Sequence, residues 1–385
     1  MRRIALFILS IITCCFVGLS QAQAGEVIST VALNSGSQHM ALSADGSKLY
    51  VTSNSNNSVS VVNTTTGQVI ATWSVSGAPT ALAISPDGTR LVVVTAGATY
   101  KLFDTSTGLV VQSIPAISGC LDPRAMVYHP LGGAIYIACG SGNYRVASID
   151  TSTFGTSIIY HGSLERYFIA VSKNASELVA VGSTVRYINA GVNYAVSGTA
   201  SGVAMSDDGV RSYVSETNGN VEIFGAGLTT QLALGGQLSS IAVQSARGVG
   251  YVTDSSGKLL KIFSLTTGAV SATYPVGNGA TDVAVNADAT RAYVLNTTDN
   301  TVTFISLVGQ VFGENIPTAA MQQFVRTSDG TCQVQPTDLV DFPALASLKD
   351  QAWGRSWAQW PNGGSGGFVC VRQPYYNSGN TWSVR

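Results

Sequence analysis

Short runs of apolar residues recur through most of the chain, and Gly, Asn or Asp bounds each run. In the first clear unit this pattern predicts strands at 40–43, 48–53, 58–63 and 68–75, with a hairpin turn at Asp45 and Gly46. The stretch from 26 to 307 shows no convincing helical periodicity. The pattern therefore predicts an all-β fold made of four-stranded units.

The unit recurs seven times along the chain. Its shared turn position returns every 34 to 44 residues, at Asp45, Asp87, Leu131, Asn174, Asp208, Ala246 and Asp288. One aligned position of the first strand is nearly always small, at Ala41, Ala83, Val127, Ala170, Ala204, Ala242 and Ala284. A period near forty residues predicts the blades of a β-propeller, and small inner residues suit blades that converge on an axis. The fourth copy is the weakest, with two poorly marked strands in 185–196.

The last unit lacks a fourth strand. Its pattern predicts strands at 281–286, 291–296 and 301–307 and then stops. The missing sequence stands at the other end of the repeats, where EVISTVAL at 26–33 resembles the fourth strand QVIATWSV at 68–75. We therefore predict a seven-bladed β-propeller over 25–308, closed by its N-terminal strand, because closure protects the sheet edges of an open array.

Several copies share a sequence signature. It comprises SPDGTRL at 85–91, YVTS at 50–53, YVTD at 251–254, YVLN at 293–296 and VSVVNTTTGQVIAT at 59–72. By these motifs the chain resembles the YVTN-repeat family of propellers over about residues 26–307. The resemblance implies a propeller fold. The family is similar to lactonase-type, nucleic-acid-binding and surface-layer propellers, so the resemblance leaves the function open.

The first 24 residues have the pattern of a signal peptide. Arg2 and Arg3 precede an apolar run at 4–19, and Ala22, Gln23 and Ala24 form a small-x-small cleavage pattern before Gly25. The run is short for a bilayer span, and no later segment is apolar and long enough to span one. We therefore expect a secreted, periplasmic or cell-surface protein with no membrane span after signal cleavage.

Charge and cysteine content narrow the function classes. Charged residues make up 11% of the chain and the net charge is −1, so no basic surface for nucleic acid is expected. Four cysteines remain after cleavage and allow three pairings; chain position favours Cys120–Cys139 and Cys332–Cys370. The chain has no CxxC, CxxCH or HExxH motif. We therefore expect no metal and no cofactor.

Composition changes after about residue 308. Residues 309–320 read as a linker, and 321–385 as a small Trp-rich module with a helix at 337–353, a strand at 368–372 and a Gly-rich loop between them. A Cys332–Cys370 bridge makes this a disulfide-stapled α+β module. Its tryptophans at Trp353, Trp357 and Trp360 either stack on sugar rings, or form the core of the module or pack it against the propeller. A packing role is the favoured alternative, because Trp dominates small cores.

Two aligned positions near the start of each inner strand line the predicted mouth of the central channel. The first comprises Gln38, Thr80, Arg124, Tyr167, Ser201, Ser239 and Thr281, and the second His39, Ala81, Ala125, Phe168, Gly202, Ser240 and Asp282. Candidate ligand-binding residues among and beside them are His39, Arg124, Arg166, Tyr167 and Asp282. They suggest a cationic, aromatic-flanked mouth for an anionic or sugar-like ligand; loop packing with solvated charge is the alternative.

Catalytic chemistry has little support in the sequence. Asp45, Asp87 and Asp208 recur because Asp-Gly suits a tight turn, and His39, His129 and His161 fall in different parts of the repeats. No GxSxG motif occurs, and no catalytic residue is assigned. The sequence favours an exported, non-catalytic recognition or adhesion protein that binds a glycan, a surface component or a protein partner. The alternatives are a lactonase-type hydrolase with its site at the channel mouth and a structural surface-layer component.

Overall fold

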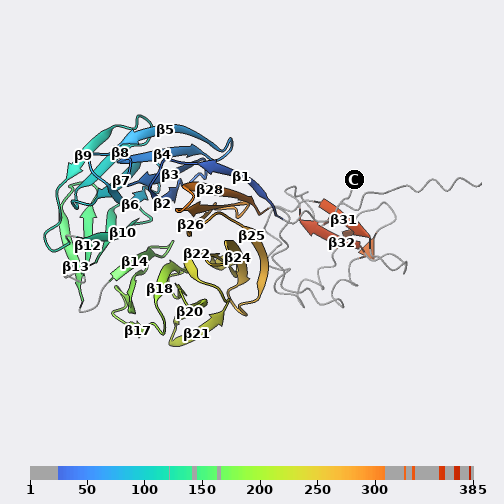
Figure 1. Cartoon of the computed structure of the whole chain (residues 1–385). Coiled ribbons are helices and arrows are strands. Elements are labelled where there is room, and N and C mark those ends of the chain that lie inside the picture. Colours follow the sequence, from blue (N-terminus) through green and yellow to red (C-terminus); the bar gives the residue numbers. More distant parts are fainter. Residues whose placement is uncertain are drawn as a thin grey trace, which may run out of the picture. The chain divides into compact units, whose positions relative to one another are not determined.

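Seven antiparallel sheets of four strands each form the blades of a ring in this computed structural model (Figure 1). It describes residues 25–307 apart from 121, 141–144 and 163–165, together with 325–326, 332–333, 355–359, 368–372 and 381–382. The side chain of Arg166 and those beyond 307 are outside this description. The predicted seven-bladed propeller is confirmed. Within the described residues the helical content is one 3-10 turn, η1 (Ser245–Arg247).

Each blade runs from an inner strand at the axis to an outer strand at the rim (Figure 1). The inner strands are β2 (Ser37–Leu42), β6 (Pro79–Ile84), β10 (Pro123–Tyr128), β14 (Arg166–Val171), β18 (Ala200–Met205), β22 (Leu238–Gln244) and β26 (Ala280–Val285). The second strands are β3 (Lys48–Ser53), β7 (Arg90–Thr95), β11 (Ala134–Cys139), β15 (Leu178–Gly182), β19 (Ser212–Glu216), β23 (Val249–Asp254) and β27 (Arg291–Asn296). The third strands are β4 (Ser58–Asn63), β8 (Tyr100–Asp104), β12 (Arg145–Asp150), β16 (Thr184–Tyr187), β20 (Asn220–Gly225), β24 (Leu259–Ser264) and β28 (Thr301–Ser306). The outer strands are β5 (Gln68–Ser74), β9 (Val110–Ile114), β13 (Thr156–His161), β17 (Asn193–Ala195), β21 (Leu228–Ala233), β25 (Val270–Pro275) and β1 (Val27–Ala32).

The ring closes through the N-terminal strand, as the sequence predicts. Strand β1 is the outer strand of the seventh blade and pairs antiparallel with β28, with Val31 opposite Val302. The pairing continues beyond the strand, since the backbone N–H of Glu26 donates to the carbonyl of Ser306 at 3.1 Å. The first and last parts of the propeller sequence thus share one sheet.

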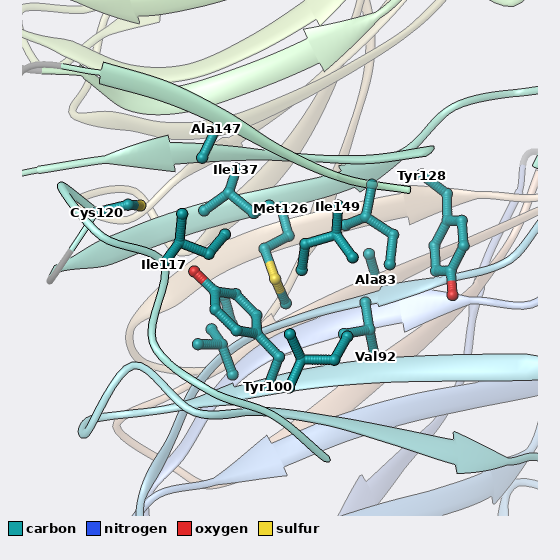
Figure 2. Close-up of a cluster of buried hydrophobic side chains, with 14 of the residues drawn as sticks. Ala83, Val92, Tyr100, Ile117, Cys120, Met126, Tyr128, Ile137, Ala147 and Ile149 are labelled. Carbon is teal, nitrogen blue, oxygen red and sulfur yellow. The ribbon is translucent and has the colours of Figure 1, made fainter. Parts of the chain in front are cut away.

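Hydrophobic side chains fill the spaces between neighbouring blades. One such cluster joins Val92 and Tyr100 of the second blade to Met126, Ile137 and Ile149 of the third (Figure 2). The Tyr100 side chain and the aliphatic side chains of this cluster are almost fully buried. Because each blade buries both of its faces in this way, the core is a series of interfaces around the ring.

A size match between the first two strands recurs around the ring. Alanines of the inner strand lie directly opposite tyrosines of the second strand in four blades: Ala41 with Tyr50, Ala204 with Tyr213, Ala242 with Tyr251 and Ala284 with Tyr293. Directly opposed residues are the closest side-chain neighbours in an antiparallel pair. The recurrent alanine therefore gives room to a buried tyrosine as well as fitting the taper of the blades.

Beyond the propeller, five short strands form two small sheets. They are β29 (Val325–Arg326), β30 (Cys332–Gln333), β31 (Arg355–Gln359), β32 (Phe368–Arg372) and β33 (Thr381–Trp382). Strand β30 lies between β29 and β33, while β31 pairs with β32. These strands belong to a compact unit distinct from the propeller.

Several predictions for the chain ends lie outside the described residues. They are the signal peptide at 1–24, the linker at 309–320, the helix at 337–353 and the Gly-rich loop. Cys332 and Cys370 lie in different small sheets, and their disulfide stays a prediction. Within the described part of the chain, no helix has the length and apolar character needed to cross a bilayer.

Candidate functional site

Every inner strand is irregular near its beginning. The register with the second strand shifts after the first paired residue of β2, β6, β10, β14, β18, β22 and β26. The residues skipped by the pairing include Gln38, Thr80, Arg124, Tyr167, Ser201, Ser239 and Thr281. A β-bulge re-aims the side chain at the extra residue. The first of the two aligned positions predicted to line the channel mouth is thus the position of the bulged residue in every blade.

Two bulged residues of neighbouring blades lie together and depart from the small polar pattern. The Arg124 guanidinium carbon lies 6.0 Å from the centroid of the Tyr167 ring, within the range of a cation–π contact. The Tyr167 side chain belongs to the exposed hydrophobics, at 37% relative exposure. We name Asp122, Arg124 and Tyr167 the Arg124–Tyr167 patch. It offers a cation and an aromatic face at one place on the ring.

Asp122 is the partner of Arg124 in this patch. Its Oδ2 atom accepts from Arg124 Nε at 2.9 Å and lies 2.7 Å from Arg124 Nη2. The Arg124 side chain remains 49% exposed. An exposed ion pair adds little stability, so its effect here is to orient the guanidinium. A guanidinium carries five N–H donors, and this pair uses only two of its nitrogens.

The segment that carries the patch is held by a disulfide. Cys120 and Cys139 are joined with a Cα–Cα distance of 5.2 Å, which confirms this predicted bridge. The adjoining backbone is fixed as well, because the Gly140 N–H donates to the Asp122 carbonyl at 2.7 Å. Gly140 leaves room for the ion pair, since a Cβ there would lie 2.8 Å from Arg124 Nε and 2.9 Å from Asp122 Oδ2 and would displace these side chains. The bridge thus positions the loop before β10.

A second group of polar residues joins the sixth, seventh and first blades. Asp282 Oδ2 accepts from the backbone N–H of Met40 at 3.3 Å, across the ring closure. Its Oδ1 accepts from Ser240 Oγ at 3.1 Å and from the N–H of Val283 at 2.9 Å. Asp282 and His39 are on adjacent blades, as expected, but the carboxylate bonds to the backbone of Met40 and not to the imidazole. Its geometry is that of a brace between blades.

Burial changes the protonation of this group. Burial raises the pKa of Asp282 to about 6, although three hydrogen bonds to the carboxylate oppose the shift. Burial also lowers the pKa of His39, so the imidazole is neutral at pH 7. A neutral His39 adds no positive charge to the ring at this pH. The accessible cation among the predicted site residues with described side chains is therefore Arg124.

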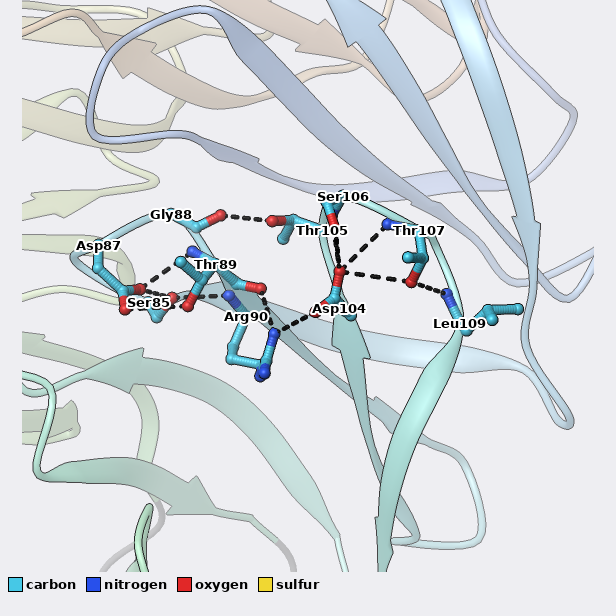
Figure 3. A network of polar contacts seen from close by, with 10 residues as sticks. All are labelled: Ser85, Asp87, Gly88, Thr89, Arg90, Asp104, Thr105, Ser106, Thr107 and Leu109. Atoms are coloured by element: carbon cyan, nitrogen blue, oxygen red, sulfur yellow. Dashed lines mark hydrogen bonds and ion pairs between the residues drawn. The ribbon is translucent and has the colours of Figure 1, made fainter.

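The recurrent turn aspartates are held as structural groups. Ser85 Oγ donates to Asp87 Oδ1 at 2.6 Å and the Thr89 N–H donates to the same oxygen at 3.0 Å (Figure 3). The hydrogen bond from Ser85, followed by that from Thr89, lowers the pKa of Asp87. Asp45 and Asp208 accept equivalent bonds from Ser43 and Ser206. These contacts support the interpretation of the aspartates as turn residues.

The remaining candidates are dispersed. His129 Nδ1 accepts from the Leu131 N–H at 3.1 Å in a turn, while His161 ends the outer strand β13. In the described ranges, no group of three or more His, Cys, Asp or Glu side chains is arranged to hold a metal ion. Arg166 begins β14, directly before Tyr167. Trp357 lies opposite Cys370 in the β31–β32 pair, and Trp353 and Trp360 lie outside the described residues.

Comparison with known proteins bears on the fold of this chain and not on its function. No protein-family model matches the chain, and no curated protein matches its sequence. Among solved structures, the chain is similar to a hydrazine synthase chain from Kuenenia stuttgartiensis, with a TM-score of 0.64 and 23% identity. The alignment covers 70% of this chain and 95% of that one. At this identity the likeness shows a shared propeller architecture.

Proposed function

We propose that this chain is an exported, non-catalytic recognition protein of the YVTN-repeat type whose propeller binds an acidic glycan or an acidic group of a surface partner. The observation that carries the proposal is the Arg124–Tyr167 patch. Arg124 offers further N–H donors for a carboxylate or sulfate, and the exposed Tyr167 ring offers a face for a sugar.

The way the patch is built supports a binding role. Arg124 and Tyr167 come from bulges on adjacent blades, and a disulfide and a glycine of close approach fix the loop beside them. Ligand sites need side chains that are already oriented, since this reduces the entropy lost on binding. A solvated charge on a surface loop has no such requirement.

Export is the second part of the proposal. It rests on the basic start, the apolar run and the Ala22-Gln23-Ala24 pattern, and the Cys120–Cys139 disulfide supports it. Disulfides persist in oxidising compartments outside the cytosol. Adhesion at a cell surface fits a propeller whose described part offers an exposed cation and an exposed aromatic ring.

Binding to an array of acidic and neutral glycans tests the proposal. We expect selective binding of acidic glycans, weakened at least about tenfold in Arg124→Ala, the loss of one charge-assisted hydrogen bond. Tyr167→Ala should weaken binding to a smaller extent. Lys173→Ala is the matched control, because Lys173 is an exposed cation that forms a loose 3.7 Å pair with Asp207. Unchanged binding in a folded Arg124→Ala protein would rule out the patch.

Two measurements separate the alternatives. Turnover of a lactone panel, lost in Arg124→Ala or Asp282→Ala, would replace recognition by a lactonase-type activity. Growth of ordered assemblies in light scattering, without glycan binding, would favour a surface-layer role. In the glycan assay Trp357→Ala tests the stacking expected of the C-terminal tryptophans.

A further inference from the structure

Two buried glutamates of the fifth blade lie close together, and no cationic side chain of the described residues pairs with them. Glu216 ends β19 and is fully buried, and Glu222 in β20 is 4% exposed. Backbone N–H groups of one loop hold them: Ser197 donates to Glu222 Oε2 at 3.0 Å and Gly198 to Glu216 Oε1 at 2.7 Å. Burial, and then the Glu222 carboxylate, raise the pKa of Glu216. Two like charges in such a place destabilise each other.

Among the described residues, one oxygen of this pair is buried and meets no donor in good hydrogen-bond geometry, although the Asn218 side chain lies near enough to oppose the rise that burial causes in the pKa of Glu216. It is Glu216 Oε2, whose surface is closed to solvent. It lies beneath Gly198, where a Cβ would be 2.9 Å from Oε2 and 2.6 Å from Asn218 Nδ2. An unsatisfied buried carboxylate oxygen is costly and calls for an explanation such as an absent ion.

The sixth blade shows what occupies the equivalent place. Asp254 ends β23 as Glu216 ends β19, and Lys261 faces Val252 as Glu222 faces Val214. There the Lys261 ammonium lies 2.8 Å from Asp254 Oδ2 and donates to the carbonyls of Leu234 at 3.1 Å and Gly235 at 2.8 Å. Burial alone would raise the pKa of Asp254, but Lys261 and nearby N–H donors lower it to about 2. A cation therefore fits this position of a blade.

We propose that Glu216 and Glu222 bind a divalent cation from solution, which occupies in the fifth blade the place of the Lys261 ammonium in the sixth. The charge of two carboxylates matches a divalent ion. Their hard oxygen donors favour Ca²⁺, which accepts carboxylates and carbonyls in flexible geometry, over Mg²⁺, which retains its waters. No sequence motif marks this site, because its ligands are repeat positions on two strands.

Thermal unfolding of the full mature chain at pH 7.5, with CaCl₂ or with EDTA, tests the proposal. Calcium at about a hundred times its Kd should raise the Tm of the natural protein by roughly 4–5 °C. Glu222→Lys supplies the cation covalently, as the sixth blade does. In EDTA its Tm should equal or exceed that of the natural protein, and calcium should no longer raise it. Asp282→Asn, an acidic residue outside the pair, should keep the full calcium response.

Direct titration with CaCl₂ in a calorimeter gives a second readout that does not depend on stability. The natural protein should bind one ion here, and Glu216→Gln with Glu222→Gln should lose that ion; this variant also serves if Glu222→Lys fails to fold. If calcium leaves both Tm and heat unchanged, while Tm falls as pH rises, the carboxylates share a proton and the proposal is wrong. Calcium binding that survives in the double variant would overturn it equally.

Discussion

At the residue scale, the Asp282 carboxyl couples ring closure to pH. Its folded pKa of about 6 lies above the ordinary value of 3.8, so the folded protein holds this proton over a range in which the unfolded chain has lost it. The resulting stabilisation is complete below about pH 4 and is lost as the pH rises through 6. Asp282 therefore makes the folded ring more stable in mild acid than at neutral pH.

Asp282→Asn should remove this dependence. The amide oxygen still accepts a hydrogen bond but has no charge to desolvate. Between pH 4 and 7 the natural protein should lose up to about 3 kcal/mol more stability than the variant, from the size of the shift. Urea unfolding of both proteins across this range gives the difference. Parallel pH profiles would show that Asp282 is not the group responsible.

The Cys120–Cys139 bridge has a separate effect on stability and binding. It encloses a sequence separation of 19, for which loss of the cross-link should cost about 3 kcal/mol. We expect Cys120→Ser with Cys139→Ser to unfold at lower urea and to bind acidic glycan more weakly, because the Asp122 segment loosens. Reductant should reproduce both effects in the natural protein, and in the double variant it should leave glycan binding unchanged, since the bridge predicted between Cys332 and Cys370 lies outside the propeller.

At the element scale, the second and third strands of the blades follow closely from the sequence, whereas the start of the first inner strand does not. The ranges predicted for β3, β4 and β27 agree with the structure because glycine and asparagine turns bound their alternating runs. The inner strand of the first blade begins at Ser37, three residues before the predicted start. Its bulge interrupts the alternation on which the prediction rests.

Part of the candidate site could also be predicted from the sequence. Repeat alignment is enough to identify Arg124 and Tyr167, because both occupy a column that is otherwise small and polar. Asp122 and Gly140 lie outside the repeated pattern, so only the folded loop reveals their contacts with Arg124. The hydrogen bond that the Met40 N–H donates to Asp282 likewise depends on the distance between neighbouring blades. The pattern of strands along the sequence does not give this distance.

Strand β1 carries the strongest prediction at this scale. Deleting residues 26–34 removes the outer strand of the seventh blade, exposes the edge of β28 and leaves Val302 without its partner Val31. We expect a loss of more than about 3 kcal/mol, in the range of severe changes to a core. Thermal unfolding should show it, while removal of residues 383–385 should have little effect. Equal Tm values for the two truncations would contradict closure by β1.

At the scale of the whole molecule, the ring is a series of blades that is closed at one sheet. Among the described residues, six of the seven hydrophobic clusters join blades that follow one another in sequence, and the remaining cluster joins the first blade to the seventh. The cluster at the closure brings Val31 and Met40 against Tyr293 and Phe304. Stability of the ring as a unit therefore depends on contacts between its two sequence ends.

Maturation can be checked on the intact protein. When the full chain is expressed in a bacterium with a secretory pathway, we expect the exported form to begin at Gly25, since Ala22-Gln23-Ala24 precedes it. N-terminal sequencing of the periplasmic or secreted fraction measures this. Recovery of the chain with Met1 intact would contradict export by this route, and Ala24→Leu should slow cleavage by filling the small-residue position.

The pairing of Val27 with Ile305 also sets an order of events during synthesis. A ribosome adds about 5–20 residues per second, so β1 emerges roughly 15–60 s before the partner strand with which it completes a blade. Until then β1 remains a single strand that no neighbour satisfies. The last blade therefore cannot be completed before β28 has been synthesised.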